Sequence, residues 1–229
     1  MDVASEEKGE SLAEHAWSEI ARVGAAFGDP NRLKILHLLG QSRRSGEELA
    51  TMLGLSAPNV SAHLRTLLEA GMVSRTREGR RVYYALRCPS VATLLLTLRD
   101  AGMELSAELR ESMRDFDVDA PLDSLSSPEL EARVRDGSLW VVDVRPVEEY
   151  AAGHLPLARH VEMTALAEFC RELPSGSEVL VYCRGPFCEG AAEAVRRLRA
   201  LGVSASRWRG GVMDWSSAGH VLSASEVSL

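Results

Sequence analysis

The feature that most constrains this chain is a change of secondary-structure pattern around residues 117–127. Before this point the sequence predicts short amphipathic helices followed by a β-hairpin, and after it short apolar strands alternate with helices. The segment between the two patterns mixes Asp, Ser and Pro with few large apolar residues, as interdomain linkers do. We therefore predict an N-terminal domain over residues 1–117, a linker over 118–127 and a C-terminal domain over 128–229.

The two halves carry opposite charge, which indicates different partners. The whole chain has a net charge of −7, which by itself argues against a nucleic-acid binder. However, residues 31–99 hold eleven Lys and Arg against four Asp and Glu, whereas residues 101–229 hold thirteen against twenty-one. The first half is basic enough to meet phosphates and the second half is not.

Nothing in the sequence predicts a membrane or secretion segment. No apolar run reaches the roughly 18 residues that a membrane span needs. Residues 1–10 are acidic and polar, without the basic start and apolar core of a secretion signal. We expect a cytoplasmic protein with no membrane partner, in which the four cysteines are mostly reduced.

The N-terminal half predicts a winged helix-turn-helix, a mostly α-helical DNA-binding fold. Apolar spacing predicts helices over residues 11–27, 31–39 and 57–70, and one long helix over residues 89–116. Residues 40–44 are expected to form a loop. Ser45 and Glu48 have the spacing of a capping box and predict a further short helix that ends at Gly54. Residues 72–76 and 81–86 flank a Glu-Gly turn and predict a β-hairpin.

The second helix of such a motif fits the major groove of DNA. If Val60, Leu64 and Leu67 face the core, then a polar set lies toward the outer face and is predicted to contact DNA: Asn59, Ser61, His63 and Arg65. The hairpin adds four arginines that suit phosphates or a minor groove, namely Arg75, Arg77, Arg80 and Arg81. A basic hairpin alone is more often a solvated surface, but its position after two helices of suitable length favours DNA binding.

In these stretches the chain resembles the ArsR/SmtB family of bacterial repressors. The resemblance covers about residues 12–100 and rests on the order and spacing of GDPNRLKIL at 28–36, ELA at 48–50, LGLS at 53–56, VSAHL at 60–64, LEAGMV at 68–73 and EGRRVYY at 78–84. It implies a homodimer that pairs through its first and last helices and binds a palindromic operator in double-stranded DNA.

One departure from this family excludes a metal site known among its members. Metal-sensing relatives carry a Cys-x-Cys pair where this chain has Ser45 and Glu47, and a serine cannot replace a thiolate for a soft metal. The last helix also lacks the His and carboxylate pairs that other members use for zinc. We therefore predict no metal, and we expect Cys88 to be a turn or cap residue.

The C-terminal half predicts an α/β domain with a mainly parallel sheet. Strands are expected over residues 139–142, 178–182 and 204–208, with helices over 164–172 and 191–201. Cys183 follows the second of these strands directly, at the end of the sheet where such folds place their sites. Backbone amides of the 183–188 turn, a helix N-terminus and the charge of Arg184 would all favour the nucleophilic thiolate of Cys183.

This half resembles the rhodanese superfamily over about residues 125–220. The matching residues are VDVR at 142–145, EY at 149–150, GHLP at 153–156, YCR at 182–184 and WRGG at 208–211 with Trp215. The resemblance implies that Cys183 can accept a sulfane sulfur as a persulfide and pass it to a thiol or cyanide. Asp143 and Arg145 are expected to brace the loops as a buried or half-buried charge pair. His154 is predicted to be a hydrogen-bonded framework residue, and Cys170 a core residue.

Cys188 leaves two interpretations open. Its thiol could attack a persulfide on Cys183 and give a disulfide or a sulfur-bridged pair, or it could simply pack against the following helix. Phosphatases and arsenate reductases of the superfamily close a longer loop with an arginine, whereas this chain has Cys188 and Glu189 there. The Glu189 carboxylate would repel a dianion, so we exclude phosphatase chemistry.

Three functions remain after this comparison of motifs. The first is a transcriptional regulator, a repressor, that senses or handles reactive sulfur or an oxidant through Cys183. The second is a sulfurtransferase enzyme, using thiosulfate or a persulfide, with an accessory DNA-binding domain. The third is an inactive docking domain on a DNA-binding protein. None of them requires a cofactor, and the first two require a small sulfur donor or thiol as partner.

Overall fold

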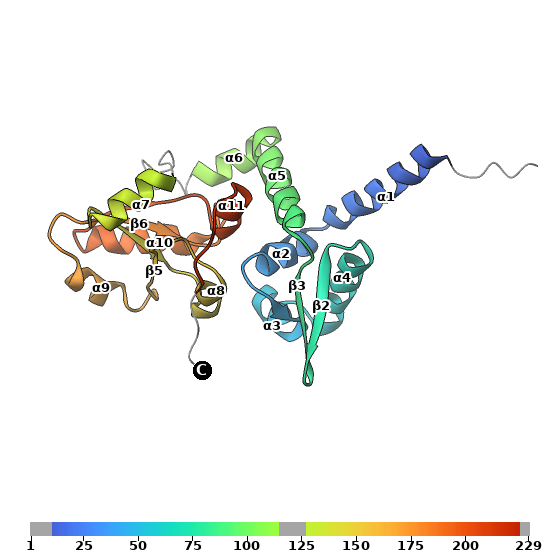
Figure 1. Cartoon of the computed structure of the whole chain (residues 1–229), viewed down its shortest axis with the longest axis horizontal. Coiled ribbons are helices and arrows are strands. Elements are labelled where there is room, and N and C mark those ends of the chain that lie inside the picture. The colour runs from blue at the N-terminus through green and yellow to red at the C-terminus, as the bar shows by residue number, and fades with distance from the viewer. Residues whose placement is uncertain (1–10, 115–126, 225–229) are drawn as a thin grey trace, which may run out of the picture. The chain divides into compact units, whose positions relative to one another are not determined.

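The computed structural model describes residues 11–114 and 127–224 of the chain (Figure 1). Within it the chain divides into two compact units. One comprises the chain up to Leu39 together with Arg43–Val91, and the other comprises Gly40–Ser42 and Ala92–Leu229. The predicted linker at 118–127 lies almost wholly outside the described residues, so the predicted domain limits stay predictions. No helix in the described ranges is long and apolar enough to cross a membrane.

The first unit has the element order of a winged helix-turn-helix. Its helices are α1 (Leu12–Phe27), α2 (Pro30–Leu39), α3 (Gly46–Leu53) and α4 (Ala57–Glu69). The capping box that begins α3 is confirmed, because Ser45 Oγ accepts from the Glu48 amide at 3.3 Å and Glu48 accepts from the Ser45 amide at 2.6 Å. Ser56 is the N-cap of α4, but its side chain makes no capping hydrogen bond.

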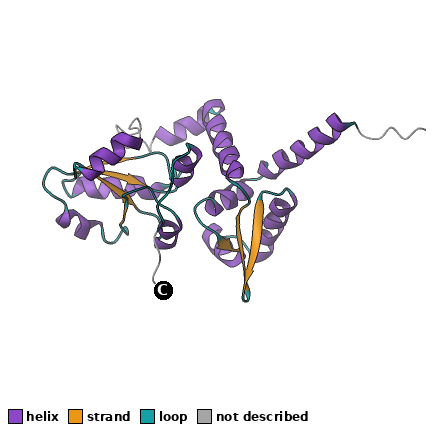
Figure 2. Cartoon of the chain, viewed as in Figure 1, coloured by secondary structure: helices purple, strands orange, loops and turns teal. Residues whose placement is uncertain are grey.

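A small antiparallel sheet completes this unit. Strands β2 (Val73–Glu78) and β3 (Arg81–Leu86) form the predicted hairpin, and Gly79 takes a φ of +60° in the two-residue turn between them (Figure 2). The expectation of a plain loop over residues 40–44 is wrong at its end, because β1 (Arg44–Ser45) pairs with β3. The core of the unit is formed by side chains that are at most 2 % exposed: Ile35, Leu36, Leu49, Val60, Leu64 and Leu67.

The single helix expected over residues 89–116 is wrong. The structure has α5 (Pro89–Leu105) and a separate α6 (Ala107–Arg114), with Ser106 between them. Ser106 still donates its amide to the Gly102 carbonyl, but its Oγ accepts from the Leu109 amide at 3.1 Å, as a serine does where a helix begins. The apolar spacing continues across this break, which is why periodicity alone did not reveal it.

The C-terminal half is built on a sheet of four parallel strands. They are β4 (Leu139–Asp143), β5 (Arg159–His160), β6 (Glu178–Tyr182) and β7 (Ser204–Arg207), in the order β5-β4-β6-β7. This confirms the predicted α/β class with its parallel sheet. The strand β5 was not predicted, because a two-residue strand has no periodicity to detect.

Helices cover both faces of this sheet. On one face α9 (Leu166–Glu172) and α10 (Glu189–Ala200) pack on Val179, Val181 and Cys183. On the other face α7 (Ser127–Arg135) and α11 (Val212–Ser217) pack on Leu180 and Tyr182. A further short helix, α8 (Val147–Ala152), follows β4. Because side chains alternate along β6, the sulfur of Cys183 faces the side of α9 and α10.

Candidate functional site

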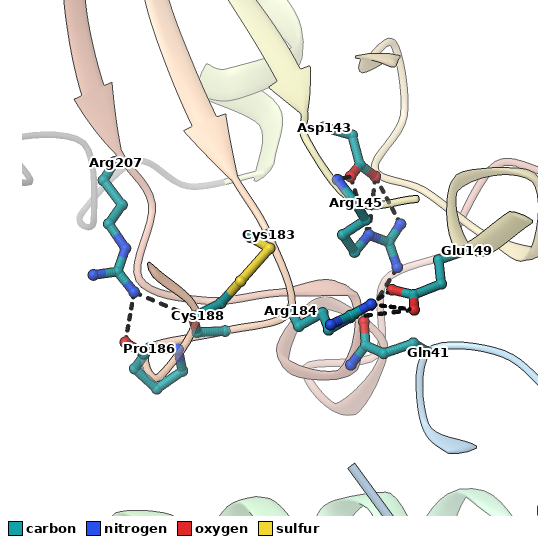
Figure 3. Close-up of a disulfide and its surroundings, with 10 residues drawn as sticks. Gln41, Asp143, Arg145, Glu149, Cys183, Arg184, Pro186, Cys188 and Arg207 are labelled. Atoms are coloured by element: carbon teal, nitrogen blue, oxygen red, sulfur yellow. Dashed lines mark hydrogen bonds and ion pairs between the residues drawn. A yellow bond between two sulfur atoms is a disulfide. The ribbon is translucent and has the colours of Figure 1, made fainter. Parts of the chain in front are cut away.

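The two cysteines of the 183–188 turn are joined by a disulfide, with their Cα atoms 6.3 Å apart (Figure 3). Cys183 is the first residue after β6, and Cys188 is the N-cap of α10. Cys183 is only 5 % exposed, whereas Cys188 is half-buried. The turn therefore joins the sulfur of Cys188 to that of Cys183, and the chemical role of each sulfur stays a prediction.

The turn itself is closed by a backbone hydrogen bond from the Cys188 amide to the Gly185 carbonyl, at 3.1 Å. Pro186 has no amide hydrogen. Pro186 and Cys188 therefore have no free N–H to turn toward the sulfur, and stabilisation of the Cys183 thiolate by the other amides of the turn stays a prediction. The pyrrolidine of Pro186 fixes its φ and suits the second position of such a turn.

Arg184 does not point at the sulfur atoms. Its Nε and Nη2 bind both carboxylate oxygens of Glu149 on α8 at 2.8–3.2 Å, and the Glu149 side chain is fully buried. Figure 3 shows Arg184 extending toward Glu149 and away from the disulfide. This carboxylate offsets the charge that we expected to stabilise the thiolate, so the predicted role of Arg184 has no geometric support.

Two residues that were not predicted to belong to the site contact the turn. Arg207, the last residue of β7, is 2 % exposed and donates from Nη2 to the carbonyls of Gly185 (3.2 Å) and Pro186 (2.5 Å). Gly211, the N-cap of α11, lies so close that a Cβ there would be 2.9–3.0 Å from the backbone of Cys183 and Arg184. The glycine lies in the WRGG motif, but the contact with the turn gives no signal in the sequence.

Asp143 and Arg145 form a fully buried ion pair at the end of β4. The Arg145 side chain bonds both Asp143 oxygens at 2.7–3.1 Å and also donates to the Gly153 carbonyl at 2.7 Å. Burial by itself lowers the pKa of Arg145, but the hydrogen bonds to Asp143 and its charge raise it overall. Burial, helped by the Asp143 charge, also raises the pKa of the Tyr182 phenol well above its usual range.

His154 and Cys170 pack against neighbouring residues of the fold. The Nδ1 atom of His154 lies 2.8 Å from the Tyr150 carbonyl, and its ring stacks on Tyr150 with the centroids 3.8 Å apart. Cys170, on α9, is half-buried in the core between this helix, α10 and the sheet, and burial raises the pKa of its thiol. Cys88 is exposed just before α5. In the described ranges no group of three or more His, Cys, Asp or Glu could hold a metal ion.

The predicted DNA-contacting residues of α4 are exposed with one exception. Asn59, Ser61 and Arg65 face solvent on this helix. The side chain of His63 is only 18 % exposed, and its Nδ1 lies 3.6 Å from Asp29 Oδ1. His63 therefore faces the N-terminus of α2, where Asp29 accepts from two backbone amides, and it is less available to a base than predicted.

The hairpin presents its four predicted arginines to solvent, namely Arg75, Arg77, Arg80 and Arg81. Its one acidic residue, Glu78, forms an ion pair with Arg43, whose guanidinium also lies 4.8 Å from the centre of the Tyr83 ring. Arg43 was not predicted as part of this surface, because it comes from the segment before β1. With Glu78 paired, the hairpin tip is more basic than its sequence alone indicates.

Comparisons with known proteins agree with this division of the chain. Residues 29–75 match the family of bacterial regulatory proteins of the arsR type, and residues 126–218 match the rhodanese-like domain.

Individual relatives match one or both halves. The chain is 37 % identical over 201 residues to the HTH-type transcriptional regulator Rv0324 of Mycobacterium tuberculosis, covering 88 % of each chain. It is 39 % identical over 54 residues to the thiosulfate sulfurtransferase GlpE of Pseudomonas putida, covering 24 % of this chain and 48 % of that one. Among solved structures, the homodimeric winged helix-turn-helix DNA-binding domain of Mb0332 from Mycobacterium bovis matches with 38 % identity and a TM-score of 0.39, over 43 % of this chain and 93 % of that one. The chain therefore belongs to the arsR family of bacterial regulatory proteins and joins its helix-turn-helix to a rhodanese-like domain.

Proposed function

We propose that this transcriptional regulator is a repressor whose rhodanese-like domain responds to reactive sulfur or to an oxidant through Cys183. The observation that carries the proposal is the pairing of Cys183 with Cys188 at the end of β6. Two thiols at this spacing can change covalent state reversibly, which is what a sensor needs. We place the protein in the cytoplasm, where the reduced pair is the resting state.

The DNA contacts are assigned to α4 and the hairpin. Helix α4 enters the major groove with Asn59, Ser61 and Arg65, and the hairpin arginines meet phosphates or the adjacent minor groove. If Arg80 binds a phosphate, Arg80→Ala should lower affinity about equally for all sequences and reduce the salt slope by about one. Arg65→Ala should instead weaken discrimination between the operator and altered operators.

The binding species is proposed to be a homodimer on a palindromic operator. Large apolar side chains are exposed on α1, where Leu12, Trp17 and Ile20 are 84 %, 69 % and 57 % exposed, and on α5 at Leu94 and Leu98. The buried residues of α1 in the single chain are Ala26 and Phe27, at the end of the helix. A second copy of the chain would cover these faces. Ile20→Glu should give a monomer by sedimentation and abolish operator binding.

The proposed sensing chemistry takes place in two steps, each an attack by a thiolate on sulfur. In the first, the Cys183 thiolate attacks the sulfane sulfur of a persulfide or polysulfide, forms a Cys183 persulfide and releases the donor's remaining thiolate or shorter polysulfide. In the second, the Cys188 thiolate attacks Sγ of the Cys183 persulfide, the disulfide forms and hydrosulfide leaves. The sulfane sulfur is reduced to sulfide while the two cysteines are oxidised, so no further oxidant is required.

The decisive experiment measures operator binding by fluorescence anisotropy before and after treatment with polysulfide. We expect a change in affinity for the parent protein, and no change for Cys183→Ser. Cys170→Ser is the matched control, because that thiol lies outside the turn and should leave the response intact. A Cys183→Ser protein that responds like its parent contradicts the proposal.

The alternative is a sulfurtransferase, which the 54-residue similarity to a thiosulfate sulfurtransferase favours. Steady turnover of thiosulfate with cyanide or a thiol acceptor would support this function over the sensor. Modification of one equivalent followed by no further reaction would support the sensor. The inactive docking domain would be supported if, in the reduced protein, the Cys183 thiol were alkylated no faster than the Cys170 thiol.

A further inference from the structure

Arg207 is a buried cation next to the cysteine turn. It is the last residue of the edge strand β7, it is 2 % exposed, and its Nη2 donates to the carbonyls of Gly185 and Pro186. Figure 3 shows it on the Cys188 side of the disulfide, opposite Arg184. A guanidinium stays charged in proteins, and burying it is costly unless hydrogen bonds compensate. The two turn carbonyls provide part of that compensation, through Nη2.

The acceptors of Arg207 lie where they control the shape of the turn. The Gly185 carbonyl also accepts from the Cys188 amide at 3.1 Å, and this bond returns the chain toward Cys183. Arg207 therefore binds the same oxygen that closes the turn, and it fixes the next peptide through Pro186. The close approach of Gly211 to the Cys183–Arg184 backbone also restricts the start of the turn.

We propose that Arg207 is a positioning residue that keeps the 183–188 turn folded, so that Cys188 stays within bonding reach of Cys183. This inference deepens the proposed function, since it names the residue that sets how readily the sensing pair closes. Holding two reacting groups in place before reaction raises their effective concentration. Hydrogen bonds from a charged donor are stronger than neutral ones, so their loss should release the turn in the reduced state.

The test is the thiol–disulfide exchange equilibrium of the full chain with glutathione. In this reaction the protein dithiol and one oxidised glutathione give the protein disulfide and two reduced glutathiones. We expect Arg207→Met to lower the equilibrium constant for disulfide formation at least tenfold. Arg207→Lys, which keeps the charge and can still reach one carbonyl, should recover part of that loss.

The matched control is Arg199→Met. Arg199 also donates to a carbonyl of β7, that of Ala205 at 2.8 Å, but it lies on α10 away from the turn and should leave the equilibrium unchanged. Thermal unfolding of each reduced protein reports general destabilisation, which by itself does not move an exchange equilibrium measured on folded protein. If Arg207→Met does not fold, Arg207→Lys carries the test, with at least a threefold decrease expected.

An unchanged constant in the folded Arg207 variants, or an equal decrease in Arg199→Met, would overturn the positioning role. The assay contains neither DNA nor a sulfur donor, so its result is separate from that of the operator experiment. A normal polysulfide response in Cys183→Ser would remove the sensor function and leave the role of Arg207 in the turn intact. A failed exchange test would remove only the role of Arg207.

Discussion

The ion pair between Arg184 and Glu149 gives a sharp test of how the site is held. Arg184→Met removes three hydrogen bonds of 2.8–3.2 Å from a carboxylate that is fully buried. Removing one partner of a buried ion pair costs about 3–5 kcal/mol, because the remaining charge loses much of its compensation. The Arg184 side chain is 24 % exposed, so water can enter the space it leaves, and we expect a smaller loss of about 2–3 kcal/mol.

The assay is urea unfolding of the full chain, monitored through its tryptophan fluorescence. Of the four tryptophans, three lie in the rhodanese-like half and one in α1, so the signal reports mainly the relevant unit: Trp140, Trp208 and Trp215, against Trp17. The matched control is Arg196→Met, which breaks an exposed pair with Glu193 at 2.9 Å and should cost less than about 1 kcal/mol.

A double-mutant cycle with Glu149→Gln separates the pair from its surroundings. If the two side chains act mainly on each other, the double variant should be more stable than the sum of the single losses predicts, by about 1–2 kcal/mol. The reasoning is refuted if Arg184→Met costs no more than Arg196→Met. It is also refuted if Arg184→Met leaves stability unchanged while slowing alkylation of Cys183, because that pattern belongs to the thiolate-stabilising role.

Three further outcomes are expected. Ser45→Ala, which removes the capping box of α3, should lower the free energy of unfolding by about 1 kcal/mol, measured by thermal denaturation, whereas Ser45→Asp should retain most of it. At neutral pH the exposed Cys88 should react with iodoacetamide faster than Cys170, because burial raises the pKa of the Cys170 thiol; mass spectrometry of the alkylated peptides tests this order. The hydrogen bond from the Arg32 backbone amide lowers the pKa of Asp29 below its ordinary value of 3.8, so the Asp29 carboxylate should stabilise the fold above that pH and lose this contribution as the pH falls further. The difference in unfolding free energy between the parent and Asp29→Asn should therefore shrink in the same pH range. A difference that stays constant with pH would contradict this expectation.

Much of the fold follows from local signals in the sequence. The capping box at Ser45, the hairpin, and the strand over residues 178–182 all depend on neighbours within a few residues, and each appears where it was predicted. The elements of the C-terminal half that were missed range from two to nine residues: β5 has two, α8 and α11 have six each, and α7 has nine. Such segments form because the surrounding sheet and core hold them, and their own sequences carry little preference.

The site was predictable in its cysteines and less so in its charges. The position of Cys183 after an apolar strand and the spacing to Cys188 could be recognised, and the structure brings these two sulfurs together. The partner of Arg184 lies 35 residues earlier in the chain, and Arg207 lies 21 residues after Pro186, so neither contact has a local signature. A sequence shows which residues are charged, but the fold determines which carboxylate or carbonyl group each of them binds.

The glycine at the start of α11 has a consequence for shortened forms of the protein. Its missing side chain lets the final helix rest directly on the peptide that carries the first cysteine of the disulfide. A truncation ahead of Gly211 would therefore retain all four strands of the sheet yet expose one side of the 183–188 turn. Fragments intended for chemistry on that thiol should extend through Ser217, where this helix ends.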